Sequence, residues 1–261
     1  KISFTVITKL ADTKMSYLSD NSQHSFRNWA ELWDNTKLDS DYEDTSFTPN
    51  ALKKEFLKYD YSNHTIKWKL TVNSNKEKMT GIVITDTLPT GFTLVDSNPI
   101  TTDEAGTSSI VNGAKNNTAA SYTFDENTRL LTVYLLDITD EEKWKNSAVK
   151  TVYITAKVKD PDTYFGNSQT IHVDNTAKLT NGFNQNLEST IGTDISNEAL
   201  SKTGSVDKTT NVVTYKVNIN KNLATIPAGA VLTDTIPAGM KLDESSVSLN
   251  KASVDNAGNI A

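Results

Sequence analysis

Three polar side chains of this sequence occupy positions where the strand pattern predicts a buried face. Lys54 lies in phase with Leu52, Asp86 lies in phase with Ile84, and Asn175 lies in phase with the apolar residues on both sides of it. Because successive side chains of a strand point to opposite faces, all three are predicted to point inward. Burying such groups is costly unless they find partners, so we expect the three to meet.

A lysine, an aspartate and an asparagine that meet in a core could form a covalent bond. Burial lowers a lysine pKa and raises an aspartate pKa, by as much as about 3–5 units. The neutral amine is then a nucleophile, and the protonated acid can polarise the amide carbonyl of the asparagine. Attack with loss of ammonia would join Lys54 to Asn175 by an isopeptide bond, formed once through proximity.

Each of these residues also has an ordinary explanation. Lys53 could be the inward lysine, with Lys54 at the surface. Asp86 could begin the turn before Pro89 by binding its own backbone. Asn175 could be a core asparagine whose hydrogen bonds are satisfied. The bond is therefore predicted only if all three side chains come together.

The segment that contains Asp86 occurs twice. Residues 82–91 are IVITDTLPTG and residues 230–239 are AVLTDTIPAG, each predicted to be a buried strand followed by a Pro-Gly turn. Lys54 recurs as Lys202 at the same offset of 148 residues, so the Lys-to-Asp spacing of 32 is kept. Self-similarity at a fixed period indicates an array, and this period suits a whole domain.

This period divides the chain into three predicted parts. Residues 1–46 are the closing strands of one repeat, residues 47–196 are a complete repeat, and residues 197–261 are the opening strands of the next. The polar segments 34–50 and 181–197 are expected to be matching connectors. A piece of a longer protein would show such incomplete edges, and an exchange of strands between copies would also complete them.

The alternation of apolar and polar residues predicts an all-β fold. Most segments of the complete repeat follow a period of two, and residues 122–124 and 130–136 are expected to form a hairpin. Several short strands separated by turn signals favour tandem immunoglobulin-like antiparallel β-sandwich repeats. One short helix is predicted over residues 139–146, because Thr139 and Glu142 have the spacing of a capping box.

The tryptophans and histidines give weaker signals. Trp68 is expected in the core, and Trp144 is expected to anchor the short helix. Trp29 and Trp33 could form either an interdomain contact or a ligand surface. The histidines have no metal-ligand spacing, and His172 falls on the outward parity.

Composition excludes several classes of function. The net charge of −6 offers no basic patch for nucleic acid. The absence of cysteine excludes thiolate metal sites, disulfides and thiol nucleophiles. No apolar run is long enough to span a membrane. A set of acidic residues could bind calcium but lacks the spacing of an EF-hand loop, and a solvated connector explains it better: Asp34, Asp39, Asp41, Glu43 and Asp44. No metal and no cofactor are expected.

At this point the sequence resembles a known family. The motif T-D-T-(L/I)-P, in both copies, together with N-T-A at residues 175–177, is similar to the repeat domains of Gram-positive surface adhesins of the collagen-binding type. Those domains are immunoglobulin-like sandwiches with internal Lys–Asn isopeptide bonds. The resemblance implies that Lys54 is the nucleophile, Asp86 the assisting acid and Asn175 the acceptor.

The same resemblance extends to the incomplete repeats. It implies that Lys202 and Asp234 are the first two members of a following triad and that Asn28 is the last member of a preceding one. One departure weakens the match at Asn28, which is followed by a tryptophan where the complete repeat has a threonine.

These inferences predict a structural and adhesive stalk repeat rather than a turnover enzyme. We expect it outside the cell, on a bacterial surface, attached to the cell wall and in contact with neighbouring repeats. The alternative is a ligand-binding module for a host extracellular-matrix protein such as collagen. The bond would close a loop of 121 residues between Lys54 and Asn175, which by the chain-entropy model for cross-links contributes roughly 5 kcal/mol.

Overall fold

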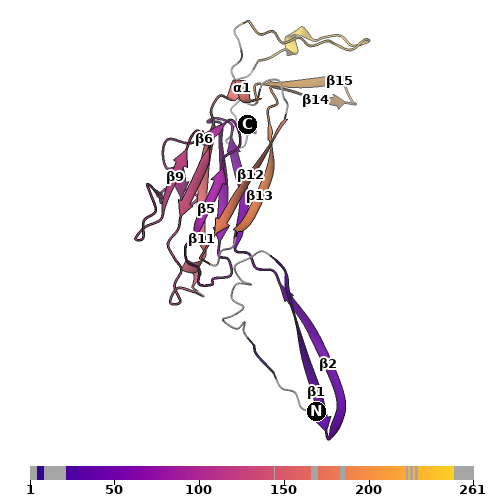
Figure 1. Cartoon of the computed structure of the whole chain (residues 1–261). Coiled ribbons are helices and arrows are strands. Elements are labelled where there is room, and N and C mark those ends of the chain that lie inside the picture. The colour runs from indigo at the N-terminus through magenta and orange to yellow at the C-terminus, as the bar shows by residue number, and fades with distance from the viewer. Residues whose placement is uncertain are drawn as a thin grey trace.

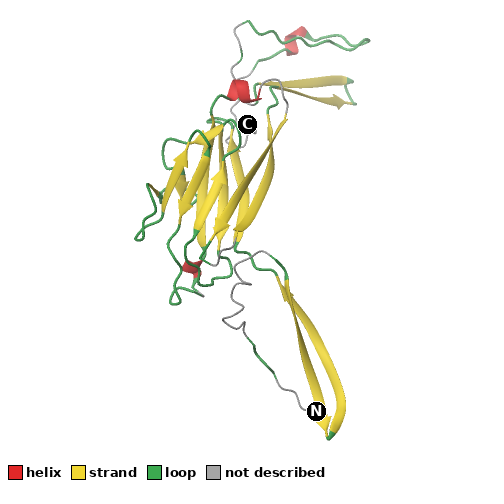
Figure 2. Cartoon of the chain, in the orientation of Figure 1, coloured by secondary structure: helices red, strands yellow, loops and turns green. Residues whose placement is uncertain are grey.

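The computed structural model describes residues 5–8, 22–143, 145–165, 170–182, 186–221, 223, 226 and 229–249. Strands dominate it, as Figure 2 shows, and the short helices are confined to connections. The strands are β1 (His24–Asp34), β2 (Thr36–Phe47), β3 (Leu52–Asp60), β4 (Thr65–Val72), β5 (Val83–Thr87), β6 (Phe92–Leu94), β7 (Ile100–Thr101), β8 (Val111–Asn112), β9 (Ser121–Asp125), β10 (Leu130–Tyr134), β11 (Lys150–Val158), β12 (Thr170–Thr180), β13 (Asn186–Ser196), β14 (Leu200–Asp207) and β15 (Val212–Ile219). The helical elements are α1 (Pro161–Phe165) and the 3₁₀ turns η2 (Asn146–Ala148) and η3 (Glu244–Ser246).

Two packed sheets form a sandwich from β3 to β13 (Figure 1). One sheet has the order β13-β12-β5-β10-β9-β8, and the other has the order β3-β4-β11-β6, with β7 also paired to β11. Neighbouring strands are antiparallel except for the two-residue pairing of β8 with β9. The predicted all-β, immunoglobulin-like sandwich is therefore confirmed, as is the hairpin now seen as β9–β10. The tandem repetition stays a prediction.

The core lies between these two sheets and follows from alternation along the strands. In β4 every second residue is buried, starting at Ile66, and Trp68 is completely buried as predicted. The opposite sheet contributes alternate residues in the same way. The largest fully buried side chains are Trp68, Phe92, Leu52, Ile66, Leu70, Met79, Ile82, Ile84, Leu88, Ile100, Leu131 and Ile138. This core fixes which residues of β3, β5 and β12 point inward.

Two hairpins lie outside the sandwich. Among the described residues, β1 pairs only with β2 and β14 pairs only with β15. The hairpin β1–β2 extends beyond one end of the sandwich, and β14–β15 lies at the opposite end (Figure 1). In the described part of the chain each forms a two-stranded sheet, an arrangement of marginal stability by itself.

The predicted connectors are wrong, because both polar segments are strands. Residues 36–47 form β2 and residues 186–196 form β13. Along β13, exposed residues alternate with half-buried or buried ones, and the strand pairs with β12 over its whole length. At a sheet edge one face of a strand remains in water, so a polar composition does not prevent strand formation.

The position of the predicted helix is also wrong. Residues 140–143 form turns that lead to η2, although Glu142 Oε2 does accept a hydrogen bond from the Thr139 N–H at 3.1 Å. The segment contains a single apolar residue, Trp144, and therefore offers no apolar face to hold a helix on the core. Trp144 itself lies outside the described residues.

The short α-helix forms at α1 instead. Asp160 caps it by accepting hydrogen bonds from the N–H and the hydroxyl of Thr163, at 3.2 and 2.6 Å. Pro161 follows in the first turn, where its missing N–H costs nothing. The helix places the ring of Tyr164 5.2 Å from that of Phe92, edge to face, so α1 closes one end of the core.

Candidate functional site

Lys54 points into the sandwich from β3. It is buried, whereas the neighbouring Lys53 is exposed and pairs with Glu55 at 2.7 Å. The Lys54 N–H also donates a hydrogen bond of 2.8 Å to Ser189 Oγ on β13. Of the two lysines considered, Lys54 is thus the inward one, and β13 helps to fix its backbone.

The Lys54 ammonium contacts the Asp86 carboxylate directly. Lys54 Nζ donates to Asp86 Oδ2, and both side chains have no solvent exposure. Asp86 reaches this position because β5 lies in the opposite sheet with Ile84 and Asp86 on its buried face. The pair therefore joins the two sheets across the core, and Asp86 does not act as a turn-forming residue.

Trp68 forms one wall of the site, a role that the sequence analysis did not assign. Lys54 Nζ lies 5.2 Å from the centre of the Trp68 ring, within the range of a cation–π contact. The sequence placed Trp68 in the core, 14 residues after Lys54, but not next to it. Register between β3 and β4 was needed to place the ring next to the amine.

Asn175 lies beside Asp86 on the adjacent strand. In the antiparallel pairing of β12 with β5, Asp86 faces Ala177. Asn175 is two residues along and on the same buried face, which is the diagonal position from which side chains reach one another. The structure therefore brings together the three residues that the sequence singled out, while their chemical roles stay predictions.

Several polar atoms of this site have no hydrogen-bond partner among the described residues. They are Asp86 Oδ1, Trp68 Nε1 and both the Oδ1 and Nδ2 atoms of Asn175. Buried polar groups are almost always paired, and an unpaired one costs about 1–3 kcal/mol. Four unpaired atoms on three neighbouring residues are more than core packing normally tolerates, which marks this cluster as a candidate functional site.

Burial controls the protonation of the pair. It lowers the pKa of Lys54, against the opposing effect of the Asp86 charge. It raises the pKa of Asp86, against the opposing effects of Lys54 and of the Asn175 side chain. Burial thus acts on both groups in the direction that favours their neutral forms.

The counterparts of these residues lie outside the sandwich. Lys202 Nζ is 2.6 Å from Asp234 Oδ1, so the predicted pair forms, but it is partly open to solvent. Asn28, which the resemblance implied to be the last member of a preceding triad, is exposed on β1 and not buried in a core. The cause is that β1–β2 has no opposing sheet among the described residues.

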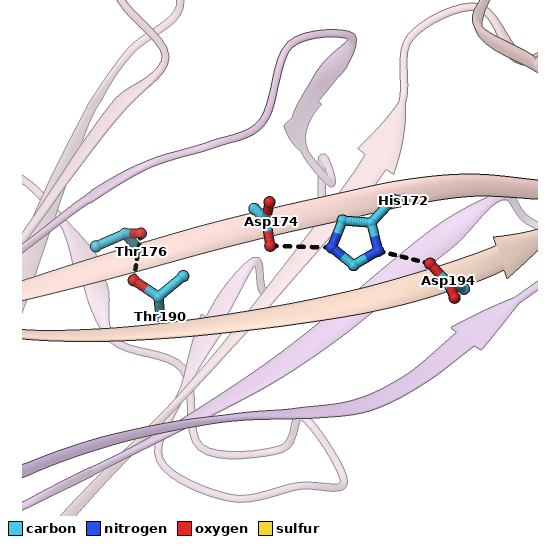
Figure 3. Close-up of polar contacts among 5 residues, drawn as sticks. All are labelled: His172, Asp174, Thr176, Thr190 and Asp194. Carbon is cyan, nitrogen blue, oxygen red and sulfur yellow. Dashed lines mark hydrogen bonds and ion pairs between the residues drawn. The ribbon is translucent and has the colours of Figure 1, made fainter.

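The outer face of β12 carries different chemistry from its buried face. As predicted, His172 points outward, and its ring bridges Asp194 at 2.6 Å and Asp174 at 3.2 Å (Figure 3). The two carboxylates raise the pKa of His172, Asp194 more than Asp174. A Cβ on Gly192 would lie 2.8 Å from the ring, so the glycine leaves room for this bridge.

The described residues show neither a metal-binding cluster nor a membrane-spanning helix. In the part of the chain that the structure describes, no group of three or more His, Cys, Asp or Glu residues has an arrangement that holds a metal ion. The acidic residues considered for calcium lie on β1 and β2 as strand residues. None of the described helices is long and apolar enough to cross a membrane.

Residues 197–261 match the family described as "Collagen binding domain". This segment is about a quarter of the chain and contains Lys202 and Asp234. The match confirms, for this segment, the predicted resemblance to surface adhesins of the collagen-binding type, and it supports a surface module of adhesin type. No protein with a curated description matches the chain.

Several solved structures resemble the chain weakly. A collagen-binding domain from a Staphylococcus aureus adhesin is 13% identical with a TM-score of 0.34, over 58% of this chain and 100% of that one. The Enterococcus faecalis adhesin ACE is 15% identical with a TM-score of 0.35, over 66% and 59%. The collagen-binding domain of Erysipelothrix rhusiopathiae RspB is 18% identical with a TM-score of 0.35, over 75% and 60%. This chain thus spans less than two thirds of the last two, and likeness at this level transfers no function.

Proposed function

We propose that this chain is a structural and adhesive module of a Gram-positive surface protein, whose sandwich cross-links itself by an isopeptide bond between Lys54 and Asn175. One observation carries the proposal. A fully buried lysine–aspartate pair lies beside an asparagine whose amide atoms have no hydrogen-bond partner among the described residues. An unpaired amide is costly as a packing element, and its carbonyl oxygen is available for the hydrogen bond from Asp86 that would polarise it.

The proposed reaction balances without any cofactor. The Lys54 amine attacks the side-chain carbonyl carbon of Asn175, a C–N bond forms, the C–NH₂ bond breaks, and ammonia leaves. Asp86 donates a hydrogen bond to the carbonyl oxygen and then passes the proton from the attacking nitrogen to the departing one. The fold supplies the proximity, and the reaction occurs once per chain, so the protein is not a turnover enzyme.

The bond would have a mechanical consequence that suits a surface stalk. Lys54 is on β3 near the start of the sandwich, and Asn175 is on β12 near its end. A covalent link between them carries a pulling force past the strands in between. In a chain without cysteine, it supplies the stabilisation that secreted domains usually obtain from disulfides. We place the parent protein outside the cell, attached to the cell wall.

The intact mass of the denatured chain tests this proposal. The wild-type chain should lack the mass of one ammonia, and peptide mapping should join Lys54 to Asn175. Lys54→Met and Asp86→Asn, both nearly isosteric, should restore the full mass. Lys53→Met is the matched control, because it removes the exposed lysine next door and should leave the ammonia loss unchanged.

A full mass in the folded wild-type chain would overturn the proposal. Circular dichroism of the same sample verifies that it is folded. An ammonia loss that persisted in Lys54→Met would also overturn it, because another side chain would then be the nucleophile. Either result would leave a sandwich module with an adhesin-like sequence and no internal cross-link.

A second candidate function is binding of an extracellular-matrix protein. The match of residues 197–261 to the collagen-binding family favours it. Surface plasmon resonance with immobilised collagen tests it, with heat-denatured collagen on a reference channel. Saturable binding to the native form alone would support this function, and equal responses on both channels would refute it.

A further inference from the structure

The two sheets of the sandwich are joined at one edge by a single side chain of β13. In the described part of the chain, β3 is the edge strand of one sheet and β13 is the edge strand of the other, and no ladder pairs them. The Lys54 N–H of β3 nevertheless donates a hydrogen bond of 2.8 Å to Ser189 Oγ of β13. The contact thus fixes the backbone of the residue that carries the proposed nucleophile.

Ser189 occupies an inward-facing position of its strand. Leu187 and Ile191, two residues before and after it, are partly buried and pack against the core, and Ser189 is half-buried between them. A hydroxyl at such a position requires a hydrogen-bond partner, and the Lys54 N–H supplies one. The sequence analysis did not single out this serine, because it assigned residues 181–197 to a connector.

The contact at Ser189 closes a circuit around the candidate site. Ser189 faces Ala177 in the pairing of β13 with β12, and Ala177 faces Asp86 in the pairing of β12 with β5. The Asp86 carboxylate binds the Lys54 ammonium, and the Lys54 N–H returns to Ser189. Asn175 lies two residues from Ala177 on the same strand, so the strand that carries the target is part of this circuit.

The circuit holds Lys54 at both ends of its side chain. A lysine amine lies at the end of a flexible four-carbon stem, and here Asp86 holds the amine while Ser189 holds the backbone. Attack on Asn175 requires the reacting atoms to come within about 3–3.5 Å. Because Ser189 and Asn175 belong to the same hairpin, the hydrogen bond from Lys54 sets where the amine lies along the strand of its target.

We propose that Ser189 is a positioning residue for the isopeptide reaction, and that it couples docking of the β12–β13 hairpin to placement of Lys54. This inference rests on the proposed function and adds a residue outside the three that react. Ser189 acts through the Lys54 backbone and not on the reacting atoms. Loss of its hydroxyl should therefore lower the rate of bond formation without shifting the pH dependence of that rate.

The test requires a full chain that has not yet reacted. Native chemical ligation in denaturant can join residues 1–119 to residues 120–261, with a temporary cysteine at position 120 that desulfurisation converts to the native Ala120. Lys54 and Asn175 are then in separate segments until ligation and meet in a fold only when the denaturant is diluted. Tryptophan fluorescence follows refolding, and the mass of acid-quenched samples follows the loss of ammonia.

Three variants of β13 test the role of the hydroxyl. Ser189→Ala should refold like the wild-type chain and lose ammonia about tenfold more slowly, by the same factor at pH 6 and at pH 8, since a displacement of about 1 Å can lower a rate roughly 100-fold. Ser189→Thr keeps a hydroxyl and should restore the rate. Thr193→Val is the matched control, because it removes another half-buried hydroxyl from the same face of β13 and should react like the wild-type chain.

The outcomes distinguish this inference from the proposed function. A wild-type chain that refolds and keeps its full mass would overturn both. Ammonia loss at the wild-type rate in Ser189→Ala would overturn the positioning role alone, as would equal slowing in Thr193→Val. A slow reaction that merely follows slow refolding of Ser189→Ala would also overturn it, because the serine would then act on folding and not on the placement of the amine.

Discussion

The two lysine–aspartate pairs of this chain agree in local geometry and differ in burial. Lys54 with Asp86 and Lys202 with Asp234 each make a direct ion pair beside an aromatic ring presented by the next strand. The first pair has no solvent exposure, whereas about a third or more of each side chain of the second is exposed. A two-stranded hairpin and the following segment are therefore sufficient to form the pair.

Burial of the pair requires the later strands β12 and β13. In the sandwich, burial lowers the pKa of Lys54 and raises that of Asp86. In the proposed reaction, the nucleophile Lys54 and the acid Asp86 come from β3 and β5, and the target Asn175 comes from the later strand β12.

The largest expected effect is a difference in stability between variants of Lys54 and of Lys202. Lys54→Met prevents the internal bond, and the free energy of unfolding should fall by roughly 5 kcal/mol, the chain entropy that closure of the loop removes. Lys202→Met breaks only a partly exposed ion pair and should cost about 0–1 kcal/mol. Urea unfolding followed by tryptophan fluorescence, on samples kept dilute, measures both.

Asn175→Ala is the companion variant for this comparison. It leaves the Lys54–Asp86 pair in place and removes only the target, so its cost should be close to the loop-closure contribution alone, whereas Lys54→Met also leaves Asp86 buried without its partner. Equal stability of Asn175→Ala and the wild-type chain would contradict the idea that the bond contributes to stability.

The sequence predicted the members of the site because strand parity is a local property. Lys54, Asp86 and Asn175 each share a face with apolar neighbours that lie two residues away, and a core-facing position can be inferred from such a pattern alone. Strand parity could not predict that β12 pairs with β5. This pairing places Asn175 diagonally next to Asp86. That contact joins residues 89 positions apart and depends on the tertiary fold.

The wrong prediction of a connector came from giving the polar composition of a segment more weight than the alternation of its apolar residues. Residues 186–196 look like a polar connector, yet Leu187, Ile191 and Ile195 alternate in phase along β13. The helix was expected at a capping box, although an aspartate followed by a proline, at Asp160 and Pro161, also marks a helix start. The position of β1–β2 outside the sandwich has no signal in its own sequence.

A smaller effect is expected at the glycine that ends each repeated motif. Gly91 and Gly239 have positive φ values of 87° and 86°, which cost other residues roughly 1–2 kcal/mol. A Cβ on Gly91 would also lie 2.4 Å from the Tyr164 ring of α1, whereas a Cβ on Gly239 would meet nothing within 4 Å. Gly91→Ala should therefore destabilise the sandwich by about 1–3 kcal/mol more than φ strain alone.

Urea unfolding of the two alanine variants measures this difference. Gly239→Ala lies outside the sandwich and should leave its unfolding midpoint unchanged. The expectation fails if the two variants shift the midpoint equally, because the repeated motif would then have the same surroundings in both copies. Gly91→Ser, which is similar in size to alanine, should behave like Gly91→Ala.

The smallest expected effect concerns the outer face of β12 and β13, where His172 bridges Asp194 and Asp174 (Figure 3). These carboxylates raise the pKa of His172 in the folded chain. Its contribution to stability is then fully present below the unfolded value of about 6.5 and is lost as the pH rises through the raised folded value. Protection of β13 amides from hydrogen exchange should therefore fall as the pH rises from about 6 to about 8, after correction for the intrinsic exchange rate.

This pH effect should depend on the proposed bond between Lys54 and Asn175. In the cross-linked chain, β12 is tied to β3 and the hairpin cannot detach, so the effect of His172 should be visible mainly in the Asn175→Ala background. There, His172→Gln should remove the pH dependence, while Lys178→Gln, which breaks the 2.6 Å pair with Glu188 on the same face, should lower protection equally at both pH values. A pH dependence of the same size with and without the bond would mean that β12–β13 opens by a route that the Lys54–Asn175 link does not restrain.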